Sequence, residues 1–398
     1  MPSVGRMTII RRRTAAAVAL LALLLPGPVM AASTASAAPA AAAGTGTHAA
    51  PELPAPTGRF AVGQEDVHLT DRSRTDPWAR SGPRELMVTM RYPAQRGTGR
   101  APAPYMSTEE ARLILADKHL DQVIDPAAFA ATRSHARAGA RPVQGRYPLI
   151  VLSPGFTVPR ATISSLAEDL ASRGYVVAAV DHAYESAATA FPGGRILTCL
   201  ACDRSQGPGG HAAVAKVRAE DVSFLLDRLT ARHPAWRHAG LIDQRRIAMG
   251  GHSMGGSAAL AAMTADQRIR AGFDMDGGLP DPLPAAGTGG RPFMLFGSAG
   301  SVPGSPANGD WSGAWPHLDG WKRWITVDGT DHFGPTDFPA IRDQLGLPHP
   351  EAPLSGSRTI ELTRTYAAAF FDQHLKGRPG QVLDGPRADA PEVRFHNP

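Results

Sequence analysis

The sequence is poor in cysteine, in net charge and in long hydrophobic runs. Its 398 residues include two cysteines and carry a formal net charge of +5. Beyond its N-terminal segment it has no apolar stretch long enough to cross a bilayer, and it has no internal repeat. These absences argue against an integral membrane protein, a repeat protein and a zinc site made of two cysteine pairs.

Most of the charge belongs to an N-terminal segment with the pattern of a signal sequence. Four arginines, Arg6 and Arg11 to Arg13, precede an apolar run at 15–25 that is too short to span a membrane. Small residues at 29–31 or 35–37 offer cleavage sites. We therefore expect residues 1–37 to be a signal peptide and the mature protein to be secreted. The alternative is a retained membrane anchor.

What remains after that segment is nearly neutral. Removing its four arginines from the 41 basic residues leaves 37, against 36 aspartates and glutamates. A net charge near +1 gives no general attraction for nucleic acid or an anionic membrane, so we expect neither as a partner. Residues 38–56, rich in alanine and proline, predict a flexible lead-in. Residues 57–385 are enough for one large domain with insertions, and 386–398 form a C-terminal tail.

The two cysteines stand three residues apart, as Cys199 and Cys202. This spacing also occurs in redox pairs and in halves of zinc sites, but no second ligand pair at a suitable spacing is present. In an exported chain a disulfide is favoured over free thiols. So short a loop gives modest stabilisation, and its expected use is to stiffen the loop that follows Phe191. We expect no metal and no organic cofactor.

From Phe60 onward the chain alternates strand and helix patterns. Residues 60–69 and 85–92 have the alternation of an opening antiparallel pair. Short apolar runs then predict buried strands, separated by helical stretches. The strands are expected at 147–152, 175–180, 246–250, 272–276, 292–297 and 324–327, and the helices at 163–173, 214–232, 257–263 and 358–376. This order predicts an α/β fold with a mostly parallel sheet of about eight strands, helices on both faces and a helical insertion at 103–146 that could cap a cleft.

One short motif points to chemistry. Residues 251–255 read G-H-S-M-G and fit the pattern G-x-S-x-G, in which a serine is presented on a tight turn between a strand and a helix. In a chain with 42 glycines such a match can arise by chance, so its surroundings decide. A short apolar strand precedes it and an alanine-rich helix follows, with small residues on both sides of the serine. Ser253 is therefore the predicted nucleophile of a serine hydrolase.

A serine nucleophile needs a base to take its proton and an acid to orient that base. After this type of turn the chain order is Asp or Glu and then His. His332 follows the last predicted strand in a turn-rich loop, and it is the predicted base. His317 is the alternative.

The acid is predicted one strand earlier than its commonest position. That position, after the strand at 292–297, has no carboxylate before Asp310. Asp276 stands at the carboxyl end of the preceding strand, ahead of two glycines, and can reach a catalytic loop. Asp274 lies deeper on the same face of that strand. We therefore predict Asp276 as the acid, with Asp310 and Asp274 as alternatives.

Negative charge that develops on a substrate carbonyl oxygen needs two backbone N–H donors. Met254, directly after the nucleophile, supplies one, and the loop 153–156 after an earlier strand supplies the other. Phe156 is the predicted second donor, because the proline in this loop has no N–H. Three aromatic residues near the predicted cleft, Trp311, Trp315 and Phe333, would suit an acyl or aromatic group. Ordinary loop packing is the alternative for the two tryptophans.

These segments resemble a known family. Residues 147–156, 169–182 and 251–256 are similar to the plasma, isoform II type of platelet-activating-factor acetylhydrolases, a branch of the α/β-hydrolases, and the resemblance covers about 92–376. That branch keeps its acid on the earlier strand, which favours Asp276. The resemblance implies hydrolysis of carboxylic esters, often of short acyl chains on phospholipids. Two departures are Pro154, where the family often has histidine, and the insertion before Tyr147.

Together these observations predict a secreted serine carboxylic-ester hydrolase that acts on a small-molecule or lipid ester through an acyl-enzyme. The alternatives are a lipase-like or cutinase-like polyester hydrolase, a serine peptidase, and a non-catalytic binding protein on the same fold. Amide cleavage usually needs further substrate-binding elements, which the sequence does not display. A binding protein would be expected to have lost a member of the catalytic set, and all three are present.

Overall fold

A computed structural model describes residues 50–397, apart from 103, 208, 280–286, 306–310 and 348. The predicted signal peptide at 1–37 and the lead-in up to residue 49 lie outside the described residues, as does Asp310. Within the described ranges, no helix combines the length and the apolar character needed to cross a bilayer.

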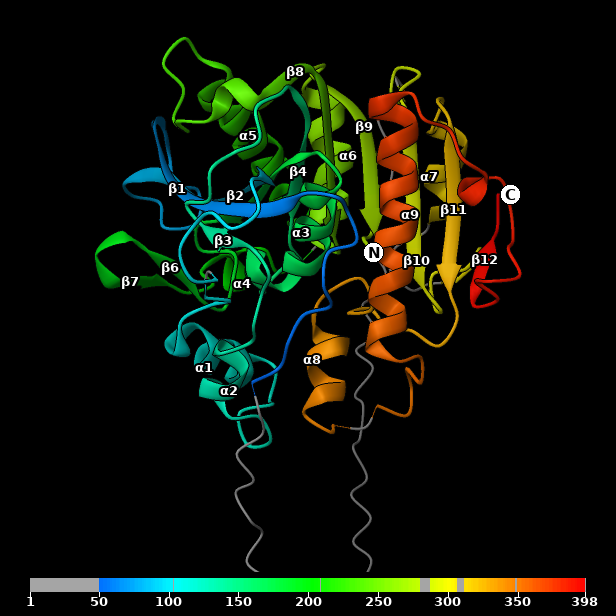
Figure 1. Ribbon diagram of the computed structural model, residues 1–398, viewed down its shortest axis with the longest axis horizontal. Coiled ribbons are helices and arrows are strands. Elements are labelled where there is room, and N and C mark those ends of the chain that lie inside the picture. The colour runs from blue at the N-terminus through cyan, green and yellow to red at the C-terminus, as the bar shows by residue number, and fades with distance from the viewer. Residues whose placement is uncertain are drawn as a thin grey trace, which may run out of the picture. The chain divides into compact units, whose positions relative to one another are not determined.

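The described chain is built on one ten-stranded sheet with the order β12-β11-β10-β9-β8-β4-β5-β2-β1-β3. Its six central strands run parallel (Figure 1): β4 (Tyr147–Ser153), β5 (Val176–His182), β8 (Ile242–His252), β9 (Ile269–Met275), β10 (Phe293–Ser298) and β11 (Lys322–Val327). An antiparallel pair, β1 (Ala61–Thr75) and β2 (Pro83–Ala94), joins them through β5. These eight strands are the predicted ones. Two short edge strands, β3 (Arg137–Ala138) and β12 (Val393–Phe395), bring the total in this sheet to ten.

Helices cover both faces of the sheet, as the α/β pattern predicts. On one face α5 (Gly210–Thr230) and α6 (Met254–Ala265) share a buried cluster with Leu149 and Val151 of β4. On the other face α3 (Ser164–Ser172) and α9 (Gly356–Lys376) share a second cluster with Ile150 and Leu152. Alternate residues of one strand therefore face two different cores, which is why the strand reads as an unbroken apolar run.

The remaining elements are short. They are α1 (Thr108–Asp117), α2 (Pro126–Ala130), α4 (Ala201–Arg204), α7 (Trp311–Ala314), α8 (Phe338–Gln344), a hairpin of β6 (Thr189–Phe191) and β7 (Arg195–Leu197), and 3-10 turns at Arg160–Ile163, Pro192–Gly194, Ala239–Leu241, Trp315–His317 and Gln381–Leu383. Of these, α1, α2 and α8 lie together on one side of the sheet (Figure 1). The predicted insertion at 103–146 is helical only over α1 and α2, because its end adds β3 to the sheet.

Both ends of the described chain contact the domain. The lead-in prediction is wrong for residues 50–56, because Leu53 is buried and Arg364 of α9 donates to the carbonyl oxygens of Pro54 and Ala55 at 2.8 and 2.9 Å. The predicted C-terminal tail contributes β12, which pairs antiparallel with β11. Polar and proline-rich segments can be held by backbone hydrogen bonds without an apolar pattern of their own.

The predicted disulfide is present. Cys199 and Cys202 are bonded to each other, and the bond lies at the start of α4, beyond the β6–β7 hairpin. It closes only residues 199–202, whereas the pairing of β6 with β7 closes the turn after Phe191, so the expected stiffening of that turn by the disulfide is wrong.

Candidate active site

Ser253 lies at the turn between β8 and α6. It has φ 53° and ψ −119°, a backbone conformation that costs energy in a residue other than glycine. Its neighbours have no room for side chains. A Cβ atom on Gly255 would lie 1.9 Å from the carbonyl oxygen of Ser153, and one on Gly251 would lie 2.4 Å from the backbone of Gly255. Glycine at these positions lets the helix approach the strand closely enough to form the turn.

The structure brings together the three residues of the predicted catalytic set. Nε2 of His332 lies 2.9 Å from Oγ of Ser253, and Nδ1 of His332 lies 2.7 Å from Oδ2 of Asp276. A carboxylate only accepts hydrogen bonds, so the ring carries its proton on Nδ1 and presents a bare Nε2 to the serine hydroxyl. Asp276 is fully buried, whereas 39% of the His332 side chain is exposed.

Asp276 is held as a charged group by its surroundings. Its Oδ1 accepts hydrogen bonds from the backbone N–H of Ser298 at 2.7 Å and from Oγ of Ser301 at 2.5 Å. Burial acts to raise the pKa of Asp276, but the hydrogen bonds from His332, Ser301 and Ser298 outweigh it and hold that pKa below its ordinary value. The strand end therefore provides an ionised acceptor for the histidine ring.

The two alternatives that the structure describes lie elsewhere. Asp274 is fully buried, and its Oδ1 accepts from the N–H of Gly277 at 2.8 Å, within the turn below Ser253. Burial raises the pKa of Asp274 well above its ordinary value, which favours the neutral form of this side chain. His317 is exposed, outside the pocket that contains Ser253.

The second residue of the motif has a role that the sequence did not reveal. His252 is buried, and its Nε2 donates to the backbone oxygen of His332 at 2.6 Å. Burial, followed by the nearby His332, lowers the pKa of His252 to about 3, so the ring stays neutral. His252 therefore anchors the loop that carries the predicted base.

The predicted oxyanion donors face the same pocket as Ser253. This cavity, of about 420 Å³, is lined by Phe156 and Met254 together with Ser253 and His332. Neither the N–H of Phe156 nor that of Met254 donates to another of the described residues. Both donors are therefore free to bind an oxygen atom in the pocket.

The side wall of this pocket includes residues that sequence reasoning missed. His211, Ala212 and Ala215, at the start of α5, line it, and the His211 ring lies 6.4 Å from that of Phe156. A helix start far along the chain brings them here, and no local motif marks them.

A buried ionic network supports the loop that carries Phe156. Arg218 donates to the carbonyl oxygen of Pro154 at 2.5 Å, to Oγ of Ser153 at 3.1 Å and to Glu185 at 2.7 Å. Glu185 in turn accepts from the backbone N–H of Thr157 through its own carbonyl oxygen, at 3.0 Å. Thr157 has φ 69°, a strained value for a β-branched residue. The network thus holds a strained loop in one conformation.

The same network contains a second row of serine, histidine and aspartate. His182 lies 3.1 Å from Oγ of Ser153 through Nε2 and 2.8 Å from Asp221 through Nδ1. All three side chains are buried, and Arg218 donates to the hydroxyl of Ser153. Burial lowers the pKa of His182, so the ring is neutral. No substrate can reach this row, and its position under the loop makes it a structural support.

The prediction that Trp311 and Trp315 line the cleft is wrong. Both are buried in the core, and Nε1 of Trp311 donates to the carbonyl oxygen of Gly277 at 2.6 Å. The two rings pack against Trp324 of β11, with centroids 5.5 and 6.2 Å away. Their large apolar surface is used to cover the sheet edge, which is the packing alternative named above. Phe333 lines a separate cavity beside the catalytic loop.

Among the described residues, no three histidine, cysteine, aspartate or glutamate side chains gather as they would around a metal ion.

The chain is similar to several known proteins. The family model of platelet-activating factor acetylhydrolase, isoform II, matches residues 45–193. A probable 1-alkyl-2-acetylglycerophosphocholine esterase from Arthroderma benhamiae is 29% identical over 86% of this chain and 93% of its own. The platelet-activating factor acetylhydrolase of Bos taurus is 29% identical over 37% of each chain. A solved ferulic acid esterase from Streptomyces cinnamoneus is 44% identical and has a TM-score of 0.77, over 87% of this chain and 99% of that one.

The chain is an α/β-hydrolase similar to the platelet-activating-factor acetylhydrolases. The relatives of this acetylhydrolase-like protein are named as esterases or acetylhydrolases, so it is a carboxylic-ester hydrolase. The sheet order and the helices on both faces are those expected of the fold.

Proposed function

We propose that this protein hydrolyses carboxylic esters through an acyl-enzyme, with Ser253 as nucleophile, His332 as general base and acid, and Asp276 as the group that orients His332. The observation that supports this most directly is the continuous row of hydrogen bonds from Asp276 through His332 to Ser253. Its geometry is the one that a serine nucleophile needs.

The proposed reaction has two halves. In the first, Oγ of Ser253 bonds to the ester carbonyl carbon, and Nε2 of His332 takes the hydroxyl proton. The N–H groups of Phe156 and Met254 stabilise the negative charge on the carbonyl oxygen. The bond between carbon and the alcohol oxygen then breaks, and His332 gives its proton to that oxygen. In the second half, water replaces the alcohol and the same steps release the acid.

The proposed substrates are short-chain or lipid-like esters, in line with the named activities of the curated relatives. A second candidate class, esters of aromatic acids, is favoured by the 44% identity with the ferulic acid esterase. The catalytic pocket, with an apolar wall around Phe156, Met254 and Leu279, is compatible with either.

A fluorophosphonate probe tests the nucleophile. We expect stoichiometric labelling of the protein, abolished by Ser253→Ala and retained by Ser153→Ala, which removes the hydroxyl of the buried row. Labelling that survives in Ser253→Ala would overturn the assignment. The absence of labelling and of turnover in the unmodified protein would favour a non-catalytic binding protein.

A substrate panel then separates the ester classes. Rates on p-nitrophenyl acetate, longer p-nitrophenyl esters, a feruloyl ester, a polyester film and a peptide anilide distinguish an esterase, a lipase, a polyester hydrolase and a peptidase. We expect the esters to be cleaved and the anilide to resist.

We also propose that the protein is exported after removal of residues 1–37. The N-terminal pattern of arginines followed by an apolar run supports this. N-terminal sequencing of the protein from the culture medium tests it, and a mature chain that begins near Met1 would overturn it.

A further inference from the structure

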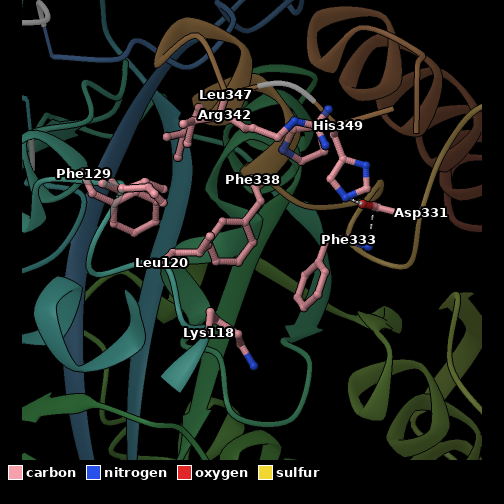
Figure 2. A pocket seen from close by; sticks show the side chains of 13 residues that line it. Lys118, Leu120, Phe129, Asp331, Phe333, Phe338, Arg342, Leu347 and His349 are labelled. Atoms are coloured by element: carbon pink, nitrogen blue, oxygen red, sulfur yellow. Dashed lines mark hydrogen bonds and ion pairs between the residues drawn. The ribbon is translucent and has the colours of Figure 1, made fainter. Parts of the chain in front are cut away.

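A second cavity lies next to the catalytic loop, on the side of α1 and α2 (Figure 2). Its volume is about 390 Å³, within the range of small-molecule sites. Apolar side chains from two parts of the chain line most of it: Leu120, Ile124 and Phe129 from the α1–α2 region, and Phe338, Ile341 and Leu347 from α8 and the loop after it. We call it the aromatic cavity. Neither the catalytic set nor the oxyanion donors lie in its wall.

A run of aromatic rings connects the aromatic cavity to His332. The ring of Phe333, the residue after the predicted base, lies 5.6 Å from the ring of His332. On its other side it meets Phe338 edge-on at 5.5 Å, and Phe338 stacks on Phe129 at 5.8 Å. In Figure 2 these three phenylalanines lie in a row across the view, with Arg342, Leu347 and His349 above them and Lys118 below. A group that leaves the catalytic centre past His332 therefore meets an aromatic wall.

Lys118 lies in the wall of this cavity, next to the oxyanion loop. Its Nζ atom donates to Oγ1 of Thr157, on the loop of the oxyanion donor, at 2.5 Å. The same atom lies 5.8 Å from the ring centre of Phe333. Lys118 thus contacts both the oxyanion loop and the histidine loop. The histidine loop borders both cavities, because His332 lines the catalytic pocket and Phe333 lines the aromatic cavity. An ester also has two limbs, the acyl group and the alcohol.

The reaction itself determines where the acyl group and the alcohol of the ester must lie. With the carbonyl oxygen held by the N–H groups of Phe156 and Met254, the bond that breaks joins the carbonyl carbon to the alcohol oxygen, and Nε2 of His332 gives that oxygen its proton. The alcohol limb must therefore lie beside His332. The acyl limb stays bonded to Ser253 and lies in the pocket with Phe156 and Met254.

We propose that the aromatic cavity binds the leaving alcohol of the ester and that it selects substrates whose alcohol carries an aromatic or bulky apolar group. This inference rests on the proposed function. Stacked and edge-on rings around Phe338 provide the surface that another ring prefers. Burial of such a group in the cavity lowers the barrier only when the group is part of the alcohol, so the orientation of the ester matters.

A pair of reversed esters tests this orientation. 2-Phenylethyl acetate carries its ring on the alcohol, and methyl 3-phenylpropanoate, its isomer, carries the same ring on the acyl group. Both have alkoxide leaving groups, and their hydroxide-catalysed rates serve to normalise the comparison. We expect kcat/KM for 2-phenylethyl acetate to be higher by about tenfold or more, since a buried apolar group contributes that much to discrimination. Equal values, or a preference for the isomer, would overturn the proposal.

Two matched tryptophan variants test whether the preference for an aromatic alcohol arises in the aromatic cavity. Leu347→Trp fills the aromatic cavity, and Leu345→Trp places the same side chain nearby, at a half-buried position outside its wall. We expect Leu347→Trp to lower kcat/KM for 2-phenylethyl acetate about tenfold and to leave ethyl acetate within about twofold. Leu345→Trp should leave both within about twofold. An equal loss on both esters in Leu347→Trp would overturn the assignment of this cavity.

The two proposals fail in different ways. If the unmodified protein hydrolyses none of the three esters, or if Ser253→Ala still hydrolyses them, the proposed function is wrong. If ethyl acetate is hydrolysed through Ser253 but the ring on the alcohol brings no advantage, only the role of the aromatic cavity is wrong.

Discussion

Replacement of Asp276 by asparagine tests the contact between Asp276 and His332, which sets the position of the proton on the histidine ring. An asparagine keeps the two hydrogen bonds at Oδ1, from the N–H of Ser298 and the hydroxyl of Ser301, because its amide oxygen accepts. Its NH₂ group then takes the place of Oδ2, 2.7 Å from Nδ1 of His332, where it can only donate. The ring must present a bare Nδ1 and carry its proton on Nε2. It can then no longer take the proton of Ser253.

We expect Asp276→Asn to lower kcat greatly and to change the stability of the fold little. Loss of the correct tautomer lowers kcat by about 10⁴, or about 5 kcal/mol of transition-state stabilisation. The fold should be retained because the hydrogen bonds at Oδ1 survive. Initial rates on p-nitrophenyl acetate, with active sites counted by fluorophosphonate, measure the first effect, and thermal unfolding followed by circular dichroism measures the second.

Asp274→Asn is the matched control. Burial favours the neutral form of Asp274, and its Oδ1 accepts from the N–H of Gly277. An asparagine preserves this bond, so kcat should change by no more than about threefold. A loss below tenfold in Asp276→Asn would refute the assignment and direct attention to Asp310. A loss of about 10⁴ in Asp274→Asn would show that Asp274 is an ionised partner.

Two further predictions concern stability. Asp337 is buried at the start of α8, and burial above all raises its pKa to about 6. The folded protein therefore holds a proton that the unfolded chain releases near pH 4, so the free energy of unfolding should fall as the pH rises from about 4 to 6, by no more than about 3 kcal/mol. Asp337→Asn should remove this fall in urea unfolding curves recorded across that range, and an unchanged slope would contradict the assignment. Reduction of the Cys199–Cys202 disulfide should lower the free energy of unfolding by about 2 kcal/mol or less, because the loop it closes is so short. The urea midpoint with and without dithiothreitol measures this, with Cys199→Ser as the reduced reference; a much larger drop would show that the bond holds more than its own loop.

The sequence predicts the parallel sheet and the nucleophile turn well because both depend on local patterns. An unbroken apolar run predicts a strand covered on both faces, and β4 and β5 are such runs. The order of Ser253, Asp276 and His332 follows from the topology, since each lies at the carboxyl end of a parallel strand. Asp276 could be chosen over Asp274 because alternate residues of a strand differ in depth.

Contacts between distant segments account for what the sequence does not predict. Arg218 lies in the middle of a long helix, and nothing near it in the sequence indicates that it binds the oxyanion loop. The two tryptophans at 311 and 315 belong to the core because β11 brings Trp324 beneath them. A loop aromatic has the same local pattern whether it faces a cleft or a core, and only the tertiary partner decides.

The hydrogen bonds of Arg364 to Pro54 and Ala55 affect how this chain can fold while it is being synthesised. Its two hydrogen bonds join segments 309 and 310 residues apart, at the beginning and near the end of the domain. A nascent chain cannot form them until α9 has left the ribosome. β9, β10 and β11 also follow the nucleophile turn, so one half of the parallel sheet is made last. The serine turn is therefore synthesised well before the acid and the base that complete it, and the site assembles only when the last third of the chain has arrived.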